Sequence, residues 1–184
     1  GTGRIYGDNL AIAAATVNNL GEAGAAPVIA ARNRLDIGAD IIDNRERALI
    51  FSAGDLAIGG SLDAGNQAAG QAGVLDNASA TIEALGSVDI AAAQINNTNQ
   101  HFSTGVQVLS AENIVEYQGQ GSPNRYLAGT PGLGWSTQDQ ALYLVTPEGT
   151  FYNWIGYNYT RTASETTVLS SEPAQILSGG AMRI

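Results

Sequence analysis

The first half of the chain repeats one pattern of small apolar residues about every 20 residues. Aligned copies bring together Ile29, Ile50 and Ile82; Leu35, Leu56 and Val88; and Ile37, Ile58 and Ile90. Apolar residues two apart face the same side of a β-strand, and the small or glycine positions between them mark bends. Such a unit is typical of a β-solenoid, whose repeats stack about 4.8 Å apart. We therefore expect parallel strands with like residues above like.

Polar positions and irregularities of the repeat fit the same interpretation. Asn19, Asn44 and Asn97 share one position, where asparagine tolerates a bend and can form a hydrogen-bonded ladder. An earlier copy around Leu10 has its upstream part slipped by one residue at positions 7–9. Residues 74–77 copy residues 41–44 after an insertion at 64–73. An Ala-rich helical protein is the alternative, but alternation with a period of two and glycines at fixed positions argue against it.

The repeat is interrupted and then returns. Residues 176–184 match residues 50–58 position by position. We therefore predict three parts: β-helix repeats over 1–97, an excursion over 98–172, and a returning, truncated repeat over 173–184. The chain starts and stops within a repeat, so we expect a segment of a longer solenoid.

The excursion is rich in aromatic residues and β-branched residues. Residues 141–145 predict a strand, 146–149 a turn with proline and glycine, and 150–162 the return strand of a hairpin. Residues 166–170 predict another strand, 110–117 fit either a helix or a strand, and 119–134 predict a loop.

Alternation along the return strand separates its aromatic residues. It puts Tyr152 and Trp154 on one face, and Phe151, Tyr157 and Tyr159 on the other. Exposed Tyr and Trp side chains favour recognition of protein or sugar, while both faces could instead form a small core. The candidate partner-binding residues are Trp135, Tyr143, Tyr152, Trp154, Tyr157 and Tyr159.

The Ile-x-Ala-x-Gly-x-Leu-x-Ile and Ile-x-Asn steps resemble the haemagglutinin repeat of filamentous haemagglutinins and contact-dependent growth inhibition toxins. Further matches lie at 95–102, 116–117, 124–126 and 159–166, so the resemblance spans nearly the whole chain. It implies a right-handed parallel β-helix with an extra-helical β-hairpin excursion. It also implies two-partner secretion through an outer-membrane transporter of Gram-negative bacteria, and a virulence filament, adhesin or toxin stalk, at the cell surface. These residues match neither the family's N-terminal secretion region nor its C-terminal toxin region, so we expect transport recognition and toxicity to lie outside them.

Composition argues against several classes of function. Seventeen acidic residues and eight basic ones give a net charge of −9, which disfavours nucleic acid and anionic membranes. The sequence has no cysteine and one histidine, so we expect no thiol chemistry, metal centre or catalytic triad. No signal peptide pattern or apolar run long enough to span a bilayer is present, so we expect no membrane insertion. The Gly132–Gly134 step lacks the remainder of a dinucleotide-binding loop, and we expect no cofactor.

Candidate catalytic groups are few. His101 is best interpreted as a structural or capping residue. Asp36 and Asp89 share a repeat position, as do Asp43 and Asp76, and stacked carboxylates serve some β-helix enzymes that act on polysaccharides. Ala57 separates the first pair, and the insertion is expected to disrupt the second, so we interpret these acids as solvated.

Three functions follow from the sequence. The first is a non-enzymatic segment of a secreted surface filament, in which the repeats form a rigid rod and the excursion contacts a target-cell receptor, protein or glycan. The second is a polysaccharide-active β-helix enzyme, and the third is a passive spacer. The first has the most support, and fold alone does not decide among them.

Overall fold

The computed structural model describes residues 3–22 and 24–184, and it is all-β, with 70% of residues in strands. No helix that could cross a membrane occurs in these described ranges. The chain divides into two compact units. Unit 1 comprises residues 1–104 and 168–184, and unit 2 comprises residues 105–167. Each unit is described by itself below.

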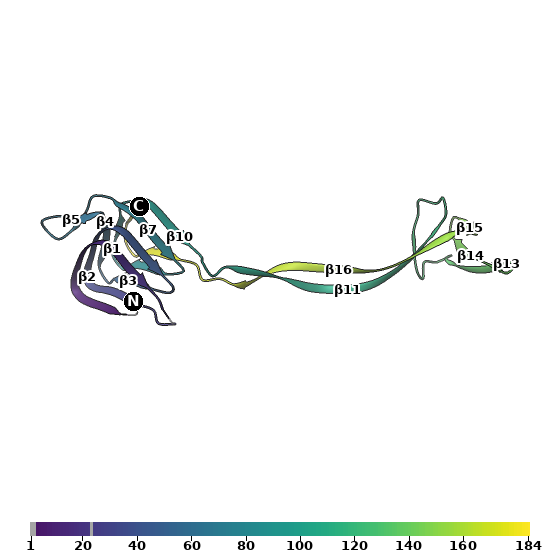
Figure 1. Cartoon of the computed structure of the whole chain (residues 1–184), viewed down its shortest axis with the longest axis horizontal. Coiled ribbons are helices and arrows are strands. Elements are labelled where there is room, and N and C mark those ends of the chain that lie inside the picture. Colours follow the sequence, from purple (N-terminus) through teal and green to yellow (C-terminus); the bar gives the residue numbers. More distant parts are fainter. Residues whose placement is uncertain (1–2, 23) are drawn as a thin grey trace. The chain divides into compact units, whose positions relative to one another are not determined.

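Ten strands of unit 1 form one nearly closed, parallel sheet (Figure 1). They are β1 (Arg4–Leu20), β2 (Val28–Arg45), β3 (Leu49–Ser52), β4 (Asp55–Gly59), β7 (Ala72–Ala78), β8 (Thr81–Ala84), β9 (Val88–Ile90), β10 (Ala92–Thr98), β17 (Gln175–Ser178) and β18 (Met182–Arg183). The all-β prediction and the parallel pairing of the repeats are confirmed.

The pairing register stacks the repeat positions as the sequence predicts. Ile50 pairs with both Ile29 and Ile82, and Ile82 pairs with Ile176. Along the neighbouring columns the pairs are Leu35–Leu56, Leu56–Val88, Val88–Met182, Ile37–Ile58 and Ile58–Ile90. The register of β1 against β2 shifts between Gly7 and Asn9, which confirms the slip expected there.

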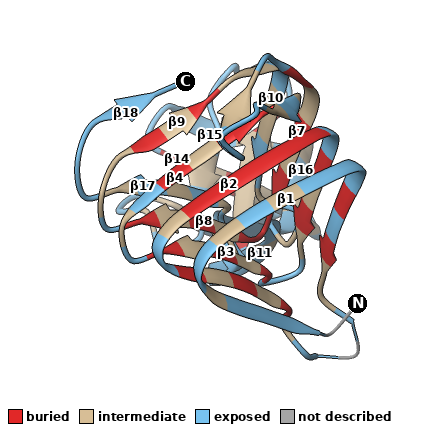
Figure 2. Cartoon of the chain, turned by 90° about the vertical axis from the view of Figure 1, so that its left-hand side faces the viewer, coloured by how far each residue is buried: buried red, intermediate tan, exposed pale blue. Residues whose placement is uncertain are grey.

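These stacked side chains are the core of unit 1. Leu35, Ile37, Ile42, Ile50 and Ile82 are fully buried. Figure 2 shows buried stretches in red along strands of this sheet such as β2. Burying each such side chain stabilises the fold by roughly 2 kcal/mol. Because every second residue of a strand points inward, the core is a narrow column of similar residues rather than a mixed cluster.

Glycine at one bend of the repeat allows the backbones to approach closely. A Cβ atom at Gly54 would lie 1.8 Å from the carbonyl oxygen of Asn33, and one at Gly86 would lie 2.8 Å from that of Gly54. Only a residue without a side chain fits between such neighbours. Gly180 occupies the same place above Gly86 and donates its N–H to the Gly86 carbonyl at 2.8 Å.

The insertion in the repeat is looped out of the sheet. Two residues shortly before it, β5 (Ser61–Leu62), and two residues within it, β6 (Ala68–Ala69), form a small antiparallel hairpin. The expectation that it disrupts the stacking of Asp43 and Asp76 is wrong, because β7 resumes the register and pairs Asp76 with Asp43 directly.

Unit 2 is built on two long strands. These are β11 (Ser103–Gly119) and β16 (Trp154–Ser170), which pair with each other, while the short β12 (Tyr126–Leu127) pairs with β11. Residues 110–117, which fit either a helix or a strand by sequence, are strand. The two strands are antiparallel, because Glu112 contacts Arg161 while Asn113 contacts Thr160. We call the paired β11 and β16 the ribbon.

A second sheet of unit 2 holds two of the six candidate site residues, Trp135 and Tyr143, and Tyr152 follows directly after it. It consists of β13 (Gly134–Gln138), β14 (Ala141–Thr146) and β15 (Gly149–Phe151), joined antiparallel in that order. We call it the aromatic sheet. The predicted hairpin around the turn at 146–149 is confirmed, but the return strand is broken at Tyr152 and Asn153. The predicted loop 119–134 also contains β12 and the first residue of β13.

Candidate functional site

One face of the aromatic sheet is packed. Trp135 and Phe151 lie on either side of Leu144, which is completely buried. The Trp135 ring makes edge-to-face contacts with Tyr117 at 5.0 Å and with Trp154 at 4.7 Å. Phe151 lies against Gly119, where an added Cβ atom would sit 2.2 Å from the ring. Leu144 is thus the buried centre of a small core on this face, and Trp135 lies at its rim with 44% of its surface exposed.

The other face of the sheet is open. The rings of Tyr143 and Tyr152 are 5.3 Å apart, and Tyr152 is 61% exposed. Phenol rings in this arrangement offer flat apolar surface together with hydroxyl groups that can donate and accept hydrogen bonds. Such a pair can bind a protein side chain or the apolar face of a sugar.

The break after β15 changes which aromatic residues share a face. Alternation along an unbroken strand predicted that Tyr152 and Trp154 would lie together. In the structure Tyr152 contacts Tyr143 on the open face, whereas Trp154 contacts Trp135 and Tyr117 and donates from Nε1 to the Leu142 carbonyl at 3.4 Å. The predicted grouping is wrong because the turn at 152–153 resets the alternation.

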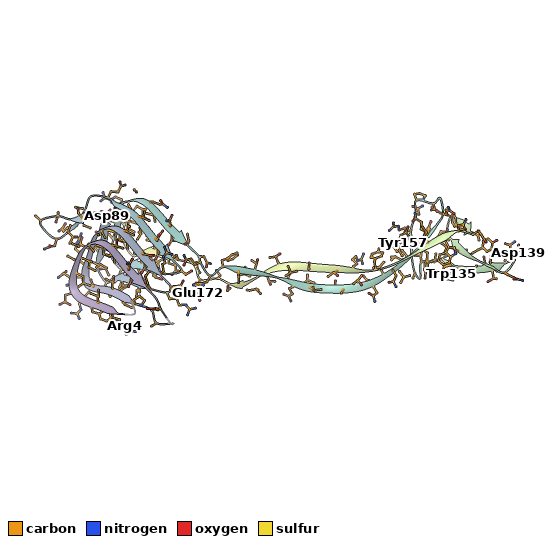
Figure 3. All side chains as sticks on the ribbon, in the orientation of Figure 1. Arg4, Asp89, Trp135, Asp139, Tyr157 and Glu172 are labelled. Atoms are coloured by element: carbon orange, nitrogen blue, oxygen red, sulfur yellow. The ribbon has the colours of Figure 1, made fainter. Side chains whose placement is uncertain are left out.

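The remaining two candidates lie on β16, as the labelled Tyr157 shows (Figure 3). Tyr157 donates to Oε1 of Gln118 at 2.7 Å, and the Arg125 guanidinium stacks 3.9 Å from its ring centroid. Tyr159 is 43% exposed, and its hydrogen bond to Glu116 raises the pKa of its phenol. Tyr157 is thus held in place, while Tyr159 presents one side to solvent.

The predicted loop before β12 supports the aromatic sheet through a contact that the sequence did not predict. Glu148, in the β14–β15 turn, accepts hydrogen bonds from Ser122 and Asn124, and these bonds lower the pKa of its carboxyl group. The turn is thereby fixed to the segment before β12. The sequence gives no periodic signal for this contact.

The aspartates at the stacked positions of unit 1 form ion pairs with arginines. Arg45 bonds to Asp43 and, at 3.2 Å, to Asp76 on the neighbouring strand. Arg34 binds the buried Asp36 at 2.7 and 3.0 Å, and Arg183 binds Asp89. Each of these carboxylates is therefore engaged by a guanidinium group, and Ala57 separates Asp36 from Asp89 as the sequence predicts.

His101 belongs to a small cluster at a turn of unit 1. Its Nε2 lies 2.8 Å from Oε2 of Glu46, and the adjacent Arg47 binds Glu172, which lowers the pKa of the Glu172 carboxyl. Both turn residues have positive φ, 57° for Glu46 and 63° for Arg47. The cluster borders a cavity of about 410 Å³ that also contacts Glu22.

Within the described residues of this cluster, the serine and the imidazole are not paired with each other. Ser170, which also borders the cavity, donates its hydroxyl to the His101 carbonyl at 2.7 Å. It is therefore not activated by the imidazole, as a nucleophile would be. Among residues 3–22 and 24–184, no group of three or more His, Asp or Glu side chains is placed to hold a metal ion.

Comparison with models of protein families, with curated proteins and with solved structures finds no match to this chain. The geometry of the two units is therefore what bears on function.

Proposed function

We propose that this chain is a non-enzymatic segment of a secreted surface filament of the haemagglutinin-repeat type from a Gram-negative bacterium. In this proposal unit 1 is a right-handed parallel β-helix within a rigid rod, and unit 2 contacts a receptor, protein or glycan, on a target cell. An outer-membrane transporter would export the full-length protein. The stacked repeat columns and the resemblance in sequence support the proposal.

The face of the aromatic sheet that bears Tyr143 and Tyr152, which we call the open tyrosine face, is the observation that supports receptor contact. The core side of the aromatic sheet already uses Trp135, Leu144 and Phe151 to hold the sheet together. Tyr143, which is half-buried, and Tyr152, which is exposed, stand side by side on the opposite face. Exposed, pre-arranged aromatic rings lose little entropy on binding and are common anchors of interfaces.

The test is binding of the chain to intact Gram-negative cells. The Tyr143→Ser/Tyr152→Ser variant should lose at least tenfold in affinity. The matched control is Tyr6→Ser, which removes an aromatic residue that is 63% exposed on unit 1 and should bind like the parent. Far-UV circular dichroism and tryptophan fluorescence establish that all three chains are folded. Saturable binding by the parent that the double variant retains, or no binding by the parent, contradicts the proposal, and the second result favours the passive spacer.

A further inference from the structure

The outer edge of β16 is a long strand edge that the rest of the described chain leaves unpaired. In the sheet order β12–β11–β16, this strand pairs on one side only. From Arg161 to Thr166 every residue is exposed. Natural proteins usually protect such an edge with lysine or proline, and residues 154–170 contain neither. A two-stranded ribbon is also marginally stable without further strands.

The sequence of β16 is complementary to itself when it is read in the opposite direction. Its only charged residues, Arg161 and Glu165, stand two places on either side of Ala163. Antiparallel pairing about Ala163 sets Arg161 opposite Glu165 of a second copy, and Glu165 opposite Arg161 of that copy. It is the only two-fold antiparallel register of β16 that places these two charges opposite each other.

The remaining pairs in this register are also favourable. Thr160 comes opposite Thr166, Thr162 opposite Ser164, and Tyr159 opposite Thr167. Threonine pairs, aromatic residues facing β-branched ones and opposite charges are the cross-strand neighbours that stabilise antiparallel sheets.

The intramolecular contacts of Arg161 leave it available for this pairing. Its Nη2 lies 2.8 Å from Oε2 of Glu112 on β11, and its side chain remains 70% exposed. Residues 161 and 165 point to the same side of the strand, so Arg161 would lie between Glu112 of its own chain and Glu165 of the second copy. The strand edge is therefore complementary in charge to its own copy.

We propose that β16 is a homodimerisation edge, through which two copies join their ribbons into one four-stranded antiparallel sheet centred on Ala163. The contact uses the backbone edge of the ribbon and not the open tyrosine face. A failure of the dimerisation test would therefore leave the receptor-binding proposal unaffected, and the reverse also holds.

Charge reversal tests the register. In sedimentation equilibrium, the parent should form a dimer, whereas Arg161→Glu alone and Glu165→Arg alone should each weaken it about tenfold or more, because like charges meet twice in each homodimer. Mixing the two variants should restore the dimer, since both pairs become complementary in the heterodimer. The control Asp139→Asn removes one exposed charge in the turn between β13 and β14, away from β16, and should dimerise like the parent.

Cross-linking tests the centre of the contact independently. The chain has no cysteine, so a single introduced thiol reports its own position. Under oxidising conditions Ala163→Cys should form a disulfide-linked dimer, because residue 163 of one copy lies opposite residue 163 of the other. Asn158→Cys, which lies ten positions from its mate in this register, should not. A parent that is monomeric at every concentration, a mixture that stays monomeric, or equal cross-linking at 158 and 163 would overturn the proposal.

Discussion

The side-chain amide of Asn44 donates a 2.8 Å hydrogen bond to Oδ1 of Asn77, and both side chains are completely buried. The same bond repeats above and below, from Asn19 to Asn44 and from Asn77 to Asn97. Asn44 also donates to the carbonyl of Thr81 at 3.1 Å. Each amide of this ladder thus links its neighbour and satisfies a backbone carbonyl that the turn leaves free.

Removing one asparagine side chain from the middle of the ladder should strongly destabilise unit 1. Asn44→Ala leaves the Asn77 amide oxygen and the Thr81 carbonyl without a buried donor, which should lower the free energy of unfolding by about 2–4 kcal/mol. Urea denaturation followed by circular dichroism measures the loss. Asn97→Ala, at the exposed end of the ladder, should cost less than about 1 kcal/mol. Equal losses in the two variants would mean that the ladder contributes little beyond packing.

A methyl group at the glycine bend should also destabilise unit 1. Gly54→Ala forces the backbone at Asn33 to move, because its Cβ atom would otherwise lie 1.8 Å from the Asn33 carbonyl oxygen. Overpacking of this kind costs about 1–3 kcal/mol, and backbone is less able to yield than a side chain. Gly3→Ala, where nothing lies within 4 Å, should be neutral within about 0.5 kcal/mol. Thermal unfolding measures the change in both variants, and an unchanged midpoint for Gly54→Ala would contradict this role of the bend.

The columns of unit 1 could be predicted from the sequence because each position is fixed by its neighbours above and below. Ile29, Ile50 and Ile82 occupy equivalent sites, so the same residue type recurs and the register is visible without a structure. The register shift between β1 and β2 near Gly7 is also visible in the sequence, because the repeat pattern is displaced by one residue there. Handedness leaves no such trace in the pattern, so the right-handed β-helix stays a prediction.

The acids and the aromatic sheet depend on contacts that no period reveals. Asp43 and Asp76 meet because the insertion is looped out in a hairpin with the residues before it, and the separation of two residues in sequence does not report that closure. Likewise the turn at 152–153 reverses which face Trp154 joins. Aromatic residues indicated where the candidate site lies, but they did not indicate which rings form its core.

Loss of the ring at position 151 should unfold the aromatic sheet selectively. Phe151→Ala removes the ring that covers Gly119, and such a deletion costs about 3–5 kcal/mol where the ring is well packed. Both tryptophans of the chain, Trp135 and Trp154, lie in unit 2 and contact each other, so their fluorescence reports this sheet.

The expected result is a lower fluorescence midpoint with an unchanged main transition in far-UV circular dichroism. Leu142→Ala, which truncates an exposed residue of β14, serves as the control and should move neither signal strongly. Coincident loss of both signals in Phe151→Ala would show that the two units unfold together.

Arg45 should stabilise unit 1 by separating two stacked carboxylates. Arg45→Gln leaves Asp43 and Asp76 side by side on paired strands, with an expected loss of about 1 kcal/mol. Asp43→Asn in the same background should recover most of that loss, because it removes the repulsion. Arg32→Gln breaks a fully surface pair with Asp8 and should change stability by less than about 0.5 kcal/mol. A second substitution that brings no recovery would contradict the proposed repulsion. Chemical denaturation of the four chains provides the comparison.

The pair of Arg47 and Glu172 should make part of the stability of unit 1 sensitive to acid. Hydrogen bonding to Arg47 lowers the pKa of the Glu172 carboxyl below its unfolded value. The folded state therefore binds fewer protons than the unfolded state in the range between the two pKa values. The stabilisation is present above the unfolded pKa, near 4.3, and is lost as the pH falls through the folded pKa.

Glu172→Gln cannot titrate and should lack this dependence. Its deficit in free energy of unfolding relative to the parent should be largest and constant above about pH 5.5, and it should shrink as the pH falls toward about 3 and the parent carboxylate is protonated. Urea denaturation across that range measures the deficit at each pH. Glu83→Gln, which removes an acid of β8 outside this cluster, controls for the change in net charge. A deficit of Glu172→Gln that stays constant with pH would mean that the contact stabilises unit 1 through packing, because an ion pair must disappear with the charge of its carboxylate.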